Sequence, residues 1–384
     1  MTNRRGGSLY HPKDRHGQER KEWAFVVDVT PAGGERRQVR RSGFRNKAEA
    51  QRALTEVLST LDHGTFVAPD AMTVADYMTA WVATLGAAGR RPSTIESYAR
   101  NVRVHIIPAI GKVKLQDLTP VHLDRLYADI GARRSPRTVR YIHTITRKAL
   151  SDAMRKGLVI RNVADAATPP SDKSTKAPEM ATWTPEQLRT FLDGIAGDRR
   201  YFPPLRLAAM TGLRRGEVLG LRWSDVDLDA GRLVVRQQVT VVGHDVAVGD
   251  LKTAAGRRTI TLDGRTVDVL RDHRRRQLEE RLLVGAGYVD QGLVFAAADG
   301  SPINPETFSR AFERLVAASG LPRLRLHDLR HTHATHLIAR GVHSKRVSAR
   351  LGHTSHSFTM DTYGHLMPDD EGDAAAAVAA MVDG

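Results

Sequence analysis

Two short strand-like runs lie near the start of the chain, Trp23 to Val29 and Arg36 to Ser42. The turn residues Pro31 to Gly34 lie between them, as expected of a β-hairpin. From Asn46 to about Leu61 the apolar residues recur at helical spacing instead. The first segment therefore predicts a hairpin followed by one helix.

The second segment, from about Met72 to Ala166, has the apolar spacing of helices. One helical stripe is formed by Val74, Tyr77, Met78, Trp81 and Leu85. Ser93 and Glu96 have the spacing of a capping box, which predicts that a further helix starts there. We expect an all-helical domain in this part of the chain.

A linker and a third domain follow. The stretch from Thr168 to Pro178 is rich in proline, serine and lysine and has no hydrophobic period, which is typical of a domain boundary. Beyond it, Thr184 and Gln187 have the spacing of a capping box, with Pro185 in the first turn of the helix that they open. The last segment is mostly helical, apart from three predicted strands: Arg232 to Val242, Asp245 to Leu251 and Arg257 to Leu262.

Length and charge narrow the class of protein. The chain has 384 residues, more than one hydrophobic core usually serves, so two or three domains are expected. Its 58 lysines and arginines exceed its 43 acidic residues, for a formal net charge of +15. This excess favours a polyanionic partner, and nucleic acid is the first candidate because each neutralised phosphate releases counterions.

Cysteine content and hydropathy exclude other classes. The chain has no cysteine, so a disulfide framework, a thiol nucleophile and a cysteine-ligated zinc site are excluded. The longest strongly apolar stretch, Ala374 to Val382, is too short to span a bilayer, and the polar start has no signal-peptide pattern. No membrane partner is therefore expected, and we expect the protein in the bacterial cytoplasm, associated with the nucleoid.

Two clusters of basic residues are candidates for contact with DNA. The first lies in and after the second predicted strand: Arg36, Arg37, Arg40, Arg41 and Arg45. It is either a basic ribbon that enters a groove or a solvated charged hairpin, and charge alone favours neither. The second lies in the helical segment: Arg133, Arg134, Arg137, Arg140, Arg147 and Lys148. A basic, all-helical domain fits a clamp on duplex DNA.

One candidate catalytic position is Arg214. Thr211 and Gly212 are expected to end a helix, and apolar residues of the next helix face inward while Arg214 points elsewhere. Glu217 follows three residues after Arg214, close enough on a helix to hold its guanidinium. An ordinary surface pair would have the same spacing, but Gly212 and Gly216, which flank this charged turn, weaken that alternative.

A second group of candidates appears in the order His327, Arg330, His353 and Tyr363. His327 and Arg330 are three residues apart, so a helix presents both on one face. His353 follows a Leu-Gly pair, and Tyr363 comes ten residues after it. A single histidine is more often structural than catalytic, but this ordered set is hard to obtain by chance.

On these residues the chain, from roughly Met180 to Leu366, resembles the tyrosine recombinase, or phage integrase, family. The resemblance implies a multidomain fold that is mainly α-helical with small β elements. Residues 1–64 would form an arm-type DNA-binding module with a three-stranded sheet and a helix, residues 67–170 a helical, SAM-like core-binding domain, and residues 178–384 a mixed α/β catalytic domain. The implied function is site-specific recombination that integrates or excises a phage or another mobile element.

The resemblance also implies the roles of the site residues. Six are catalytic and Glu217 supports the first of them: Arg214, Lys252, His327, Arg330, His353 and Tyr363. The two arginines bind the scissile phosphate, because preorganised guanidinium groups stabilise the charge of the transition state. Tyr363 is the nucleophile, and surrounding positive charge eases its hydroxyl toward phenolate. Its 3′-phosphotyrosyl product leads through a Holliday junction to rejoined strands.

Proton transfer is assigned to three further side chains. His327 would accept the proton of the tyrosine, His353 would donate to a phosphate oxygen, and Lys252 would protonate the departing 5′ oxygen. Lys252 is preferred to the neighbouring Arg257 and Arg258 because an ammonium can give up a proton, which a guanidinium does not readily do. Since the phosphotyrosyl bond conserves the energy of the phosphodiester, neither ATP nor a metal ion is needed and no cofactor is expected.

The partners implied by the resemblance are double-stranded DNA and further copies of the chain, which would act as a homotetramer on two DNA sites. An accessory DNA-bending protein and a directionality factor stay open. Integration of a phage or plasmid fits the arm-binding start best, while a transposon recombinase or a resolvase of chromosome dimers stays open too. The alanine-rich stretch Asp373 to Val382 either docks as a helix on a neighbouring protomer, packs on its own domain or frays.

Three other functions share parts of this pattern. In zinc hydrolysis His327 and His331 would bind the metal, but Asp328 is shorter than the usual glutamate base and Arg330 would place a cation beside a dication. A non-catalytic DNA-binding regulator would also have basic helices, but it would not need Tyr363. A type IB topoisomerase has a similar set of catalytic residues, but the DNA-binding modules expected at the front of the chain favour a recombinase.

Overall fold

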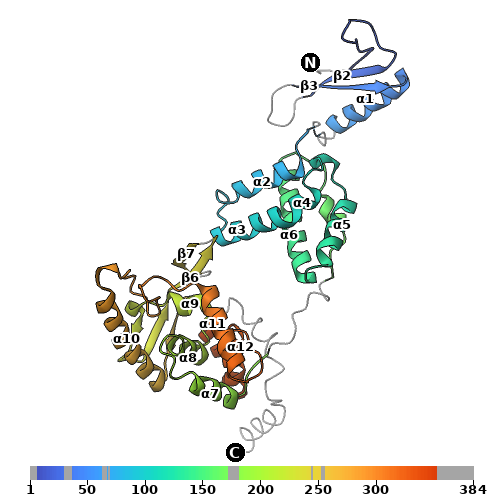
Figure 1. Cartoon of the computed structure of the whole chain (residues 1–384). Helices are drawn as coiled ribbons and strands as arrows, with labels where there is room; N and C mark the ends of the chain where they lie inside the picture. The colour runs from blue at the N-terminus through green and yellow to red at the C-terminus, as the bar shows by residue number, and fades with distance from the viewer. Residues whose placement is uncertain are drawn as a thin grey trace, which may run out of the picture. The chain divides into compact units, whose positions relative to one another are not determined.

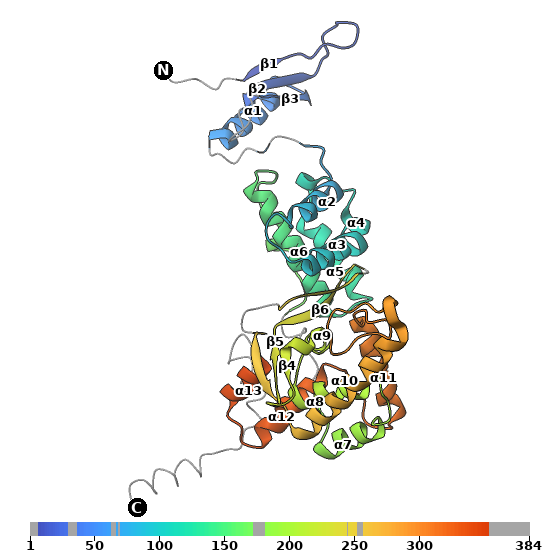
Figure 2. The same ribbon diagram turned by 90° about the vertical axis from the view of Figure 1, so that its left-hand side faces the viewer.

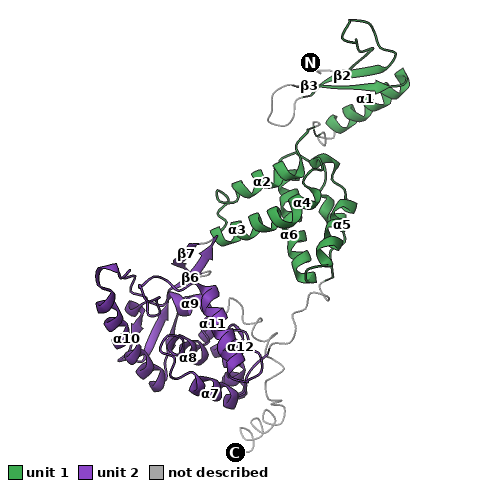
Figure 3. Ribbon diagram, viewed as in Figure 1, with its two compact units in different colours: residues 1–176 green, residues 177–384 purple. Residues whose placement is uncertain are grey.

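A computed structural model describes residues 7–29, 37–62, 67, 70–171, 181–243, 245–251 and 256–352 (Figure 1). The chain divides into two compact units, Met1–Lys176 and Ala177–Gly384 (Figure 3). Separate hydrophobic clusters lie in the N-terminal sheet, in the following helices and in the second unit. Within the described ranges, no helix has both the length and the apolar character needed to cross a membrane.

The first unit begins with a three-stranded antiparallel sheet and one helix. In spatial order the strands are β1 (Ser8–Tyr10), β2 (Trp23–Val29) and β3 (Arg37–Phe44), and helix α1 (Lys47–Asp62) follows. Alternate residues of β2 and one face of α1 form the core: Phe25, Val27, Val29, Leu54, Val57 and Leu61. The expected sheet-plus-helix fold is confirmed, although β3 continues to Phe44. The predicted turn Pro31 to Gly34 lies outside the described residues.

The rest of the first unit is helical, as predicted. Its elements are α2 (Val74–Thr84), α3 (Pro92–Asn101), the π-helical turn η1 (Val102–Ile106), α4 (Ile107–Ile110), the 3-10 turn η2 (Leu115–Asp117), α5 (Pro120–Gly131), α6 (Pro136–Arg155) and the 3-10 turn η3 (Val163–Ala166). The predicted stripe that begins on α2 is buried: Val74, Tyr77, Met78, Trp81 and Leu85. The Trp81 Nε1 donates to the Asp152 carboxylate at 2.7 Å and so fixes α2 on α6.

The predicted start of α3 is wrong. The helix begins at Pro92 with Arg91 as its N-cap residue, and no side chain caps it. Ser93 therefore lies inside the first turn and does not form the predicted capping box with Glu96. Proline suits this position because its ring fixes φ in the helical range and its missing N–H has no partner to bind in a first turn.

The second unit combines helices with two small antiparallel sheets, β4-β5-β8 and β6-β7. Its strands are β4 (Val226–Asp227), β5 (Arg232–Val235), β6 (Gln237–Val242), β7 (Asp245–Asp250) and β8 (Arg258–Thr261). Its helices are α7 (Pro185–Gly194), α8 (Phe202–Thr211), α9 (Arg215–Gly220), α10 (Gly264–Val284), α11 (Pro305–Ala318), α12 (Asp328–Ala339) and α13 (Ser344–Leu351), with 3-10 turns η5 (Trp223–Asp225) and η7 (Gly285–Gly287). The capping box of Thr184 and Gln187 opens α7 as predicted.

The single strand predicted from Arg232 to Val242 is in fact two strands in different sheets. β5 pairs with β8 up to Val235, and β6 pairs with β7 from Gln237 onward. Between them the Arg236 side chain forms an ion pair with Asp225 at 3.3 Å, and the carboxylate of Asp225 is only 7% exposed. The polar residues Arg236, Gln237 and Gln238 interrupt the apolar residues at this point, but such a break does not show that the two strands pair in different sheets.

Two glycines let β6 lie close against α9. A Cβ atom at Gly220 would lie 2.7 Å from the Cα of Gln238, and one at Gly216 would lie 2.6 Å from the carbonyl oxygen of Val239. Both of these neighbouring atoms belong to the backbone of β6, which cannot easily move. Helix α9, which carries Glu217, is thereby held at a short and fixed distance from the β6/β7 hairpin.

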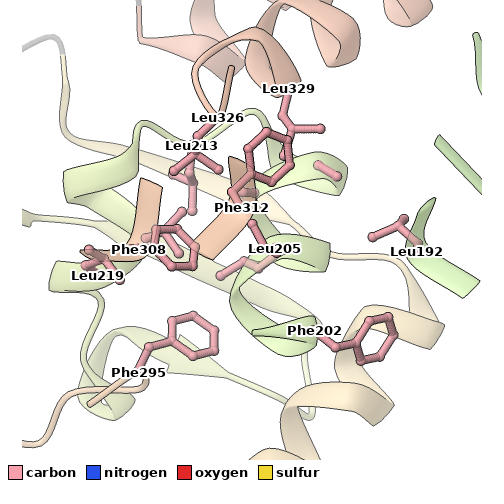
Figure 4. Packing of buried hydrophobic residues seen from close by; sticks show 14 of the residues in the cluster. Leu192, Phe202, Leu205, Leu213, Leu219, Phe295, Phe308, Phe312, Leu326 and Leu329 are labelled. Carbon is pink, nitrogen blue, oxygen red and sulfur yellow. The ribbon is translucent and has the colours of Figure 1, made fainter. Parts of the chain in front are cut away.

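The core of the second unit brings α8, α11 and α12 together. Leu205 of α8, Phe308 and Phe312 of α11 and Leu329 of α12 are buried in one cluster (Figure 4). Helix α12 contacts both α8 and α13, and α13 contacts β8 (Figure 2). The end of α13 packs on α12 in a separate, smaller cluster formed by Ala334, Ile338, Val347 and Leu351.

Candidate active site

Arg214 stands at the junction of α8 and α9. Gly212 ends α8 in the left-handed region with φ of 66°, and Arg214 is the N-cap residue of α9. The Arg214 Nη1 donates to the Glu217 Oε1 at 2.8 Å, and its backbone N–H donates to the Oε2 at 2.9 Å. The Nη2 donates to the carbonyl oxygen of Gly352 at 3.0 Å, and 37% of the Arg214 side chain stays exposed. The guanidinium is therefore held on one side and open to a ligand on the other.

Glu217 is not half of an ordinary surface pair, since only 2% of its side chain is exposed. A second arginine, Arg258, donates to the same carboxylate through Nη2 at 2.8 Å and Nη1 at 3.3 Å. Burial would raise the pKa of Glu217, but hydrogen bonds and charge from Arg258 and then Arg214 outweigh burial and hold the pKa below its usual value. Glu217 is thus an anion shared by two cations.

Arg330 is almost completely buried, with 3% exposed. Its Nη1 donates to the carbonyl oxygen of Gly212 at 2.7 Å, and its Nη2 donates to that of Leu351 at 2.7 Å. These carbonyls lie at the C-terminal ends of α8 and α13, where the helix dipole is negative and favours a cation. Arg330 therefore joins the ends of two helices from its own place in the first turn of α12.

The last turn of α13 accepts hydrogen bonds from three different arginines. The carbonyl oxygen of Arg350 accepts from Arg258 Nε at 2.7 Å, beside the bonds already described from Arg330 to Leu351 and from Arg214 to Gly352. Gly352 itself has φ of 67°, and a Cβ there would lie 2.9 Å from the Arg258 Nη1. Three successive carbonyl groups therefore bind three guanidinium groups at the end of α13.

His327 lies at the start of α12. It is the N-cap residue with helical dihedrals, and its carbonyl oxygen accepts from the Arg330 N–H at 3.2 Å. His327 is exposed while Arg330 is buried. Desolvation of its ring, followed by the charges of Arg330 and Arg214, lowers the pKa of His327, which the charge of Asp328 partly offsets. A neutral imidazole that lies within reach of both arginines can accept a proton from a nearby hydroxyl.

The carboxylate expected in a zinc site is engaged elsewhere. Asp328 accepts from Arg325 through Nε at 2.8 Å and Nη2 at 2.9 Å, and its side chain is 2% exposed. The rings of His327 and His331 meet edge to face, with centroids 5.1 Å apart. Over the part of the chain that the structure describes, no three His, Cys, Asp or Glu side chains form a group that could hold a metal ion.

Lys252, His353 and Tyr363 lie outside the described residues, as does the stretch Asp373 to Val382. The flanks of two of them reach the arginine cluster. Gly256 is the first described residue after Lys252, and it lies beside Leu251. Its carbonyl oxygen accepts a hydrogen bond from Arg258 Nη1 at 2.9 Å. Gly352, which precedes His353, accepts from Arg214. The described chain therefore brings together Arg214, Glu217, His327 and Arg330, with both flanks beside them.

Arg258 is the residue of this cluster that sequence reasoning did not single out. The two-residue period of a β-strand could have indicated that Arg258 is buried, because Arg258 lies on the same strand face as the buried Ile260. A cation on the buried face of a strand requires a buried anion. The sequence does not show that this anion is Glu217, 41 residues earlier.

Comparison with known families gives three matches along the chain. A model described as "Arm DNA-binding domain" matches residues 15–61, "Phage integrase, N-terminal SAM-like domain" matches residues 73–130, and "Phage integrase family" matches residues 183–369. An integrase of Streptomyces ambofaciens is 31% identical over 358 residues, which cover 90% of each chain. A XerC-like tyrosine recombinase of Caldanaerobacter subterraneus subsp. tengcongensis is 27% identical over 381 residues, 94% of this chain and 97% of the relative.

Solved structures share the fold. The Tn1549 transposon integrase in complex with transposon right end DNA matches with a TM-score of 0.65 and 20% identity, over 82% of this chain and all of the other. A lambda integrase tetramer bound to a Holliday junction matches with a TM-score of 0.57 and 18% identity, over 91% of this chain and 96% of the other. At this level of identity the likeness concerns the fold.

Proposed function

Since the chain belongs to the phage integrase family of site-specific recombinases, we propose that it cleaves and rejoins DNA through Tyr363, with Arg214 and Arg330 as ligands of the scissile phosphate. The observation that carries this assignment is the convergence of both arginines on the last turn of α13, at Leu351 and Gly352. In the sequence, His353 directly follows this turn. Two guanidinium groups fixed at one place suit the stabilisation of a phosphate under attack.

In each step of the proposed reaction, one phosphodiester bond forms while another breaks at the same phosphorus. The Tyr363 oxygen attacks phosphorus while the bond to the 5′ oxygen breaks, and the proton of the hydroxyl passes to His327. Lys252 gives a proton to the departing 5′ oxygen, and His353 donates to a non-bridging oxygen. The product is a 3′-phosphotyrosyl bond and a free 5′ hydroxyl, and attack by the hydroxyl of a partner strand reverses the steps.

The support for His327 as the base is electrostatic. A histidine accepts a proton only while it is neutral, and the lowered pKa of His327 favours the neutral ring. Glu217 has a different part, because its carboxylate holds the side chain of Arg214 without facing solvent. Roles for Lys252 and His353 follow from their match to the family and from the course of their flanks toward the same cluster.

Three parts of the chain would divide the work of DNA binding. Residues 1–64 would bind arm-type sites, residues 67–170 the core-type site next to the cleaved bond, and residues 178–384 would carry out catalysis. In the helical part, α6 supports this division with a basic groove lined by Arg140, Arg147, Lys148 and Arg155. Side chains of this kind suit contact with phosphates.

The working assembly would be a homotetramer on two DNA sites that passes through a Holliday junction in the bacterial cytoplasm. A plasmid with two sites separates this proposal from topoisomerase activity, since a recombinase exchanges the flanks whereas a topoisomerase only relaxes the plasmid. Accessory DNA-bending and directionality factors would appear as proteins that raise the yield or reverse the direction of exchange. Truncation after His365 tests the C-terminal stretch, because docking on a neighbour requires that the truncated chain fails to assemble on DNA.

The decisive experiment is capture of the covalent adduct on a nicked suicide substrate. Tyr363→Phe should bind the substrate as the unchanged protein does and form no adduct, because the ring stays and only the nucleophilic oxygen is lost. Tyr201→Phe is the matched control, since Tyr201 stacks on Phe308 in the core and should keep full adduct formation. An adduct with Tyr363→Phe would overturn the assignment, and cleavage without an adduct that stops on metal chelation would favour the zinc alternative.

A further inference from the structure

Arg258 is a buried cation to which the proposed reaction gives no part. Only 7% of its side chain is exposed, and it stands at the first residue of β8. Four of its donated hydrogen bonds end on Glu217 of α9, on Arg350 in α13 and on Gly256, which lies two residues before Arg258 in the chain. A single side chain therefore links the helix that supports Arg214 to the described flanks of Lys252 and His353.

Charge balance explains why a second arginine is needed beside Glu217. With one partner, the carboxylate of Glu217 would neutralise Arg214, and an ion pair is a weaker ligand for phosphate than a free guanidinium. With two partners, the cluster of Arg214, Arg258 and Glu217 keeps a net positive charge. Since Arg258 is buried and Arg214 is 37% exposed, this charge is presented through Arg214.

The shape of the side chain matters as well as its charge. The Nη1 and Nη2 of Arg258 donate to the two oxygens of Glu217 as a fork, while the Nε bonds in another direction to Arg350. A planar guanidinium has donors in both directions, whereas a lysine ammonium cannot make this set of bonds. The cluster is thus specific for arginine.

We propose that Arg258 is a positioning residue for recombination, which holds Glu217 against the last turn of α13 and so keeps Arg214 directed at the scissile phosphate with its charge available. The inference rests on the proposed function, because it takes Arg214 as a ligand of that phosphate. Arg258 itself does not touch the DNA.

The test compares Arg258→Gln and Arg258→Lys with matched changes at the neighbouring Arg257, which is exposed. Adduct formation is measured on a suicide substrate, once with the natural phosphate and once with a methylphosphonate at the scissile position. Arg258→Gln should slow adduct formation on the phosphate by about 100-fold, in the range seen when one charge-stabilising donor is lost. DNA affinity should change by less than about 3-fold, and Arg257→Gln should behave as the unchanged protein does.

The methylphosphonate separates positioning from a general loss of structure. It lacks the negative charge that Arg214 would stabilise, so the deficit of Arg258→Gln should shrink to about 10-fold or less on this substrate. A deficit of equal size on both substrates, or a variant as fast as the unchanged protein, would overturn the inference. If Arg258→Gln does not fold, Arg258→Lys, which keeps the charge but not the fork, gives the same comparison.

Failure of the inference and failure of the proposed function look different. If the unchanged protein and the Arg257 variants form no adduct on either substrate, the proposed function is wrong. If they form it and Arg258→Gln forms it equally fast, the proposed function stands and only the role of Arg258 is wrong. The thermal unfolding midpoint of each variant identifies those that fail to fold.

Discussion

At the scale of single residues, the site depends on charged groups that bind backbone rather than water. Arg330 is buried with both Nη atoms bound to carbonyl oxygens, and leaving either carbonyl without its partner costs about 1–3 kcal/mol. A lysine has too few donors in the required directions to replace it. Arg330 therefore stabilises the fold of the second unit, in addition to its proposed role as a ligand of the phosphate.

His333, in the middle of α12, is a histidine whose protonation should affect stability. Its Nε2 accepts from Arg350 Nε at 3.2 Å, and it is hydrogen-bonded to the backbone of Ala209. Burial, followed by the charge of Arg350, lowers the pKa of His333 to about 3. The folded protein therefore keeps this ring neutral, and Arg350 depends on that neutrality to donate to it.

His333 should make stability fall in mild acid. An unfolded chain binds a proton at His333 below its ordinary pKa of 6.5, while the folded chain excludes it down to about pH 3. Stability from this residue is therefore complete above pH 6.5 and declines by about 1.4 kcal/mol per pH unit below that value. Thermal unfolding midpoints at pH 7.5 and 5.5 measure the effect, and His333→Asn should reduce the difference between them.

His343→Asn is the control for this measurement. His343 is exposed and caps α13 by accepting from the backbone of Lys345, a role that asparagine also fills. The control variant should lose stability between the two pH values as the unchanged protein does. If His333→Asn keeps the full difference as well, another group is responsible for it.

Among single residues, the sequence predicted the contact between near neighbours but not the contacts between distant ones. The contact of Arg214 with Glu217 could be predicted from spacing alone, because three residues bring two side chains together locally. Arg258 could not be assigned in this way, since its partners are brought to it by two different elements. The exposed N-cap position of His327 was likewise hidden, because the spacing to Arg330 does not say where the helix begins.

At the scale of elements, two left-handed glycines end the helices that hold the arginines. Gly212 ends α8 and Gly352 ends α13, and each carbonyl accepts from an arginine of the site. In this conformation any side chain is strained. A helix end that binds a catalytic group is thus fixed by the one residue that has no side chain.

Gly212→Ala should reduce both stability and catalysis. Its Cβ would lie 2.6 Å from the Leu351 Cδ2 and 2.9 Å from the His333 ring, in addition to the strain of φ at 66°. Overpacking and strain of this kind cost about 1–3 kcal/mol, and the shifted carbonyl would no longer hold Arg330. Adduct formation per folded molecule should fall by about 10-fold or more.

Gly341→Ala is the matched control for Gly212→Ala. Gly341 has φ of 74° just after α12, and nothing lies within 4 Å of its added Cβ. It bears the backbone strain alone, so its unfolding midpoint should fall while its adduct formation stays the same. Equal loss of adduct formation in both variants would show that strain, rather than the position of Arg330, is responsible.

Elements could be predicted where one local signal dominates. The helix that starts at Thr184 and the strand from Trp23 to Val29 appear as the sequence indicates. Two predictions of elements were wrong. The division of Arg232 to Val242 between two sheets depends on strand pairing, which the sequence does not show. The start of α3 depends on a local signal instead, because Pro92 rather than Ser93 sets the first turn.

At the scale of the whole molecule, the described residues form four hydrophobic clusters, two in each compact unit, and the chain carries a formal net charge of +15. Under the proposed function, the arm and core-binding parts would add affinity, whereas catalysis would depend on groups fixed by backbone contacts in the second unit. Binding and chemistry should therefore respond differently to salt.

Affinity for duplex DNA should fall by about 10³-fold or more between 50 and 200 mM salt, as expected for about 6–10 phosphate contacts. Adduct formation by protein already bound should change by less than about 3-fold over the same range, because buried and fixed pairs are screened much less than exposed ones. Filter binding and single-turnover cleavage at saturating protein measure the two quantities. A cleavage step that loses as much as binding would show that the site assembles only through screened surface charges.

The last turn of α13 has a consequence for how such proteins evolve. The arginines at 214, 258 and 330 bind its carbonyl groups, which every amino acid possesses, so their partners leave no shared residue type in an alignment. Descendant sequences are free to change these acceptor side chains for other reasons, but not to insert or delete a residue among them. Among related sequences, we expect this turn to keep a constant length and a glycine at its end, while the side chains before that glycine vary.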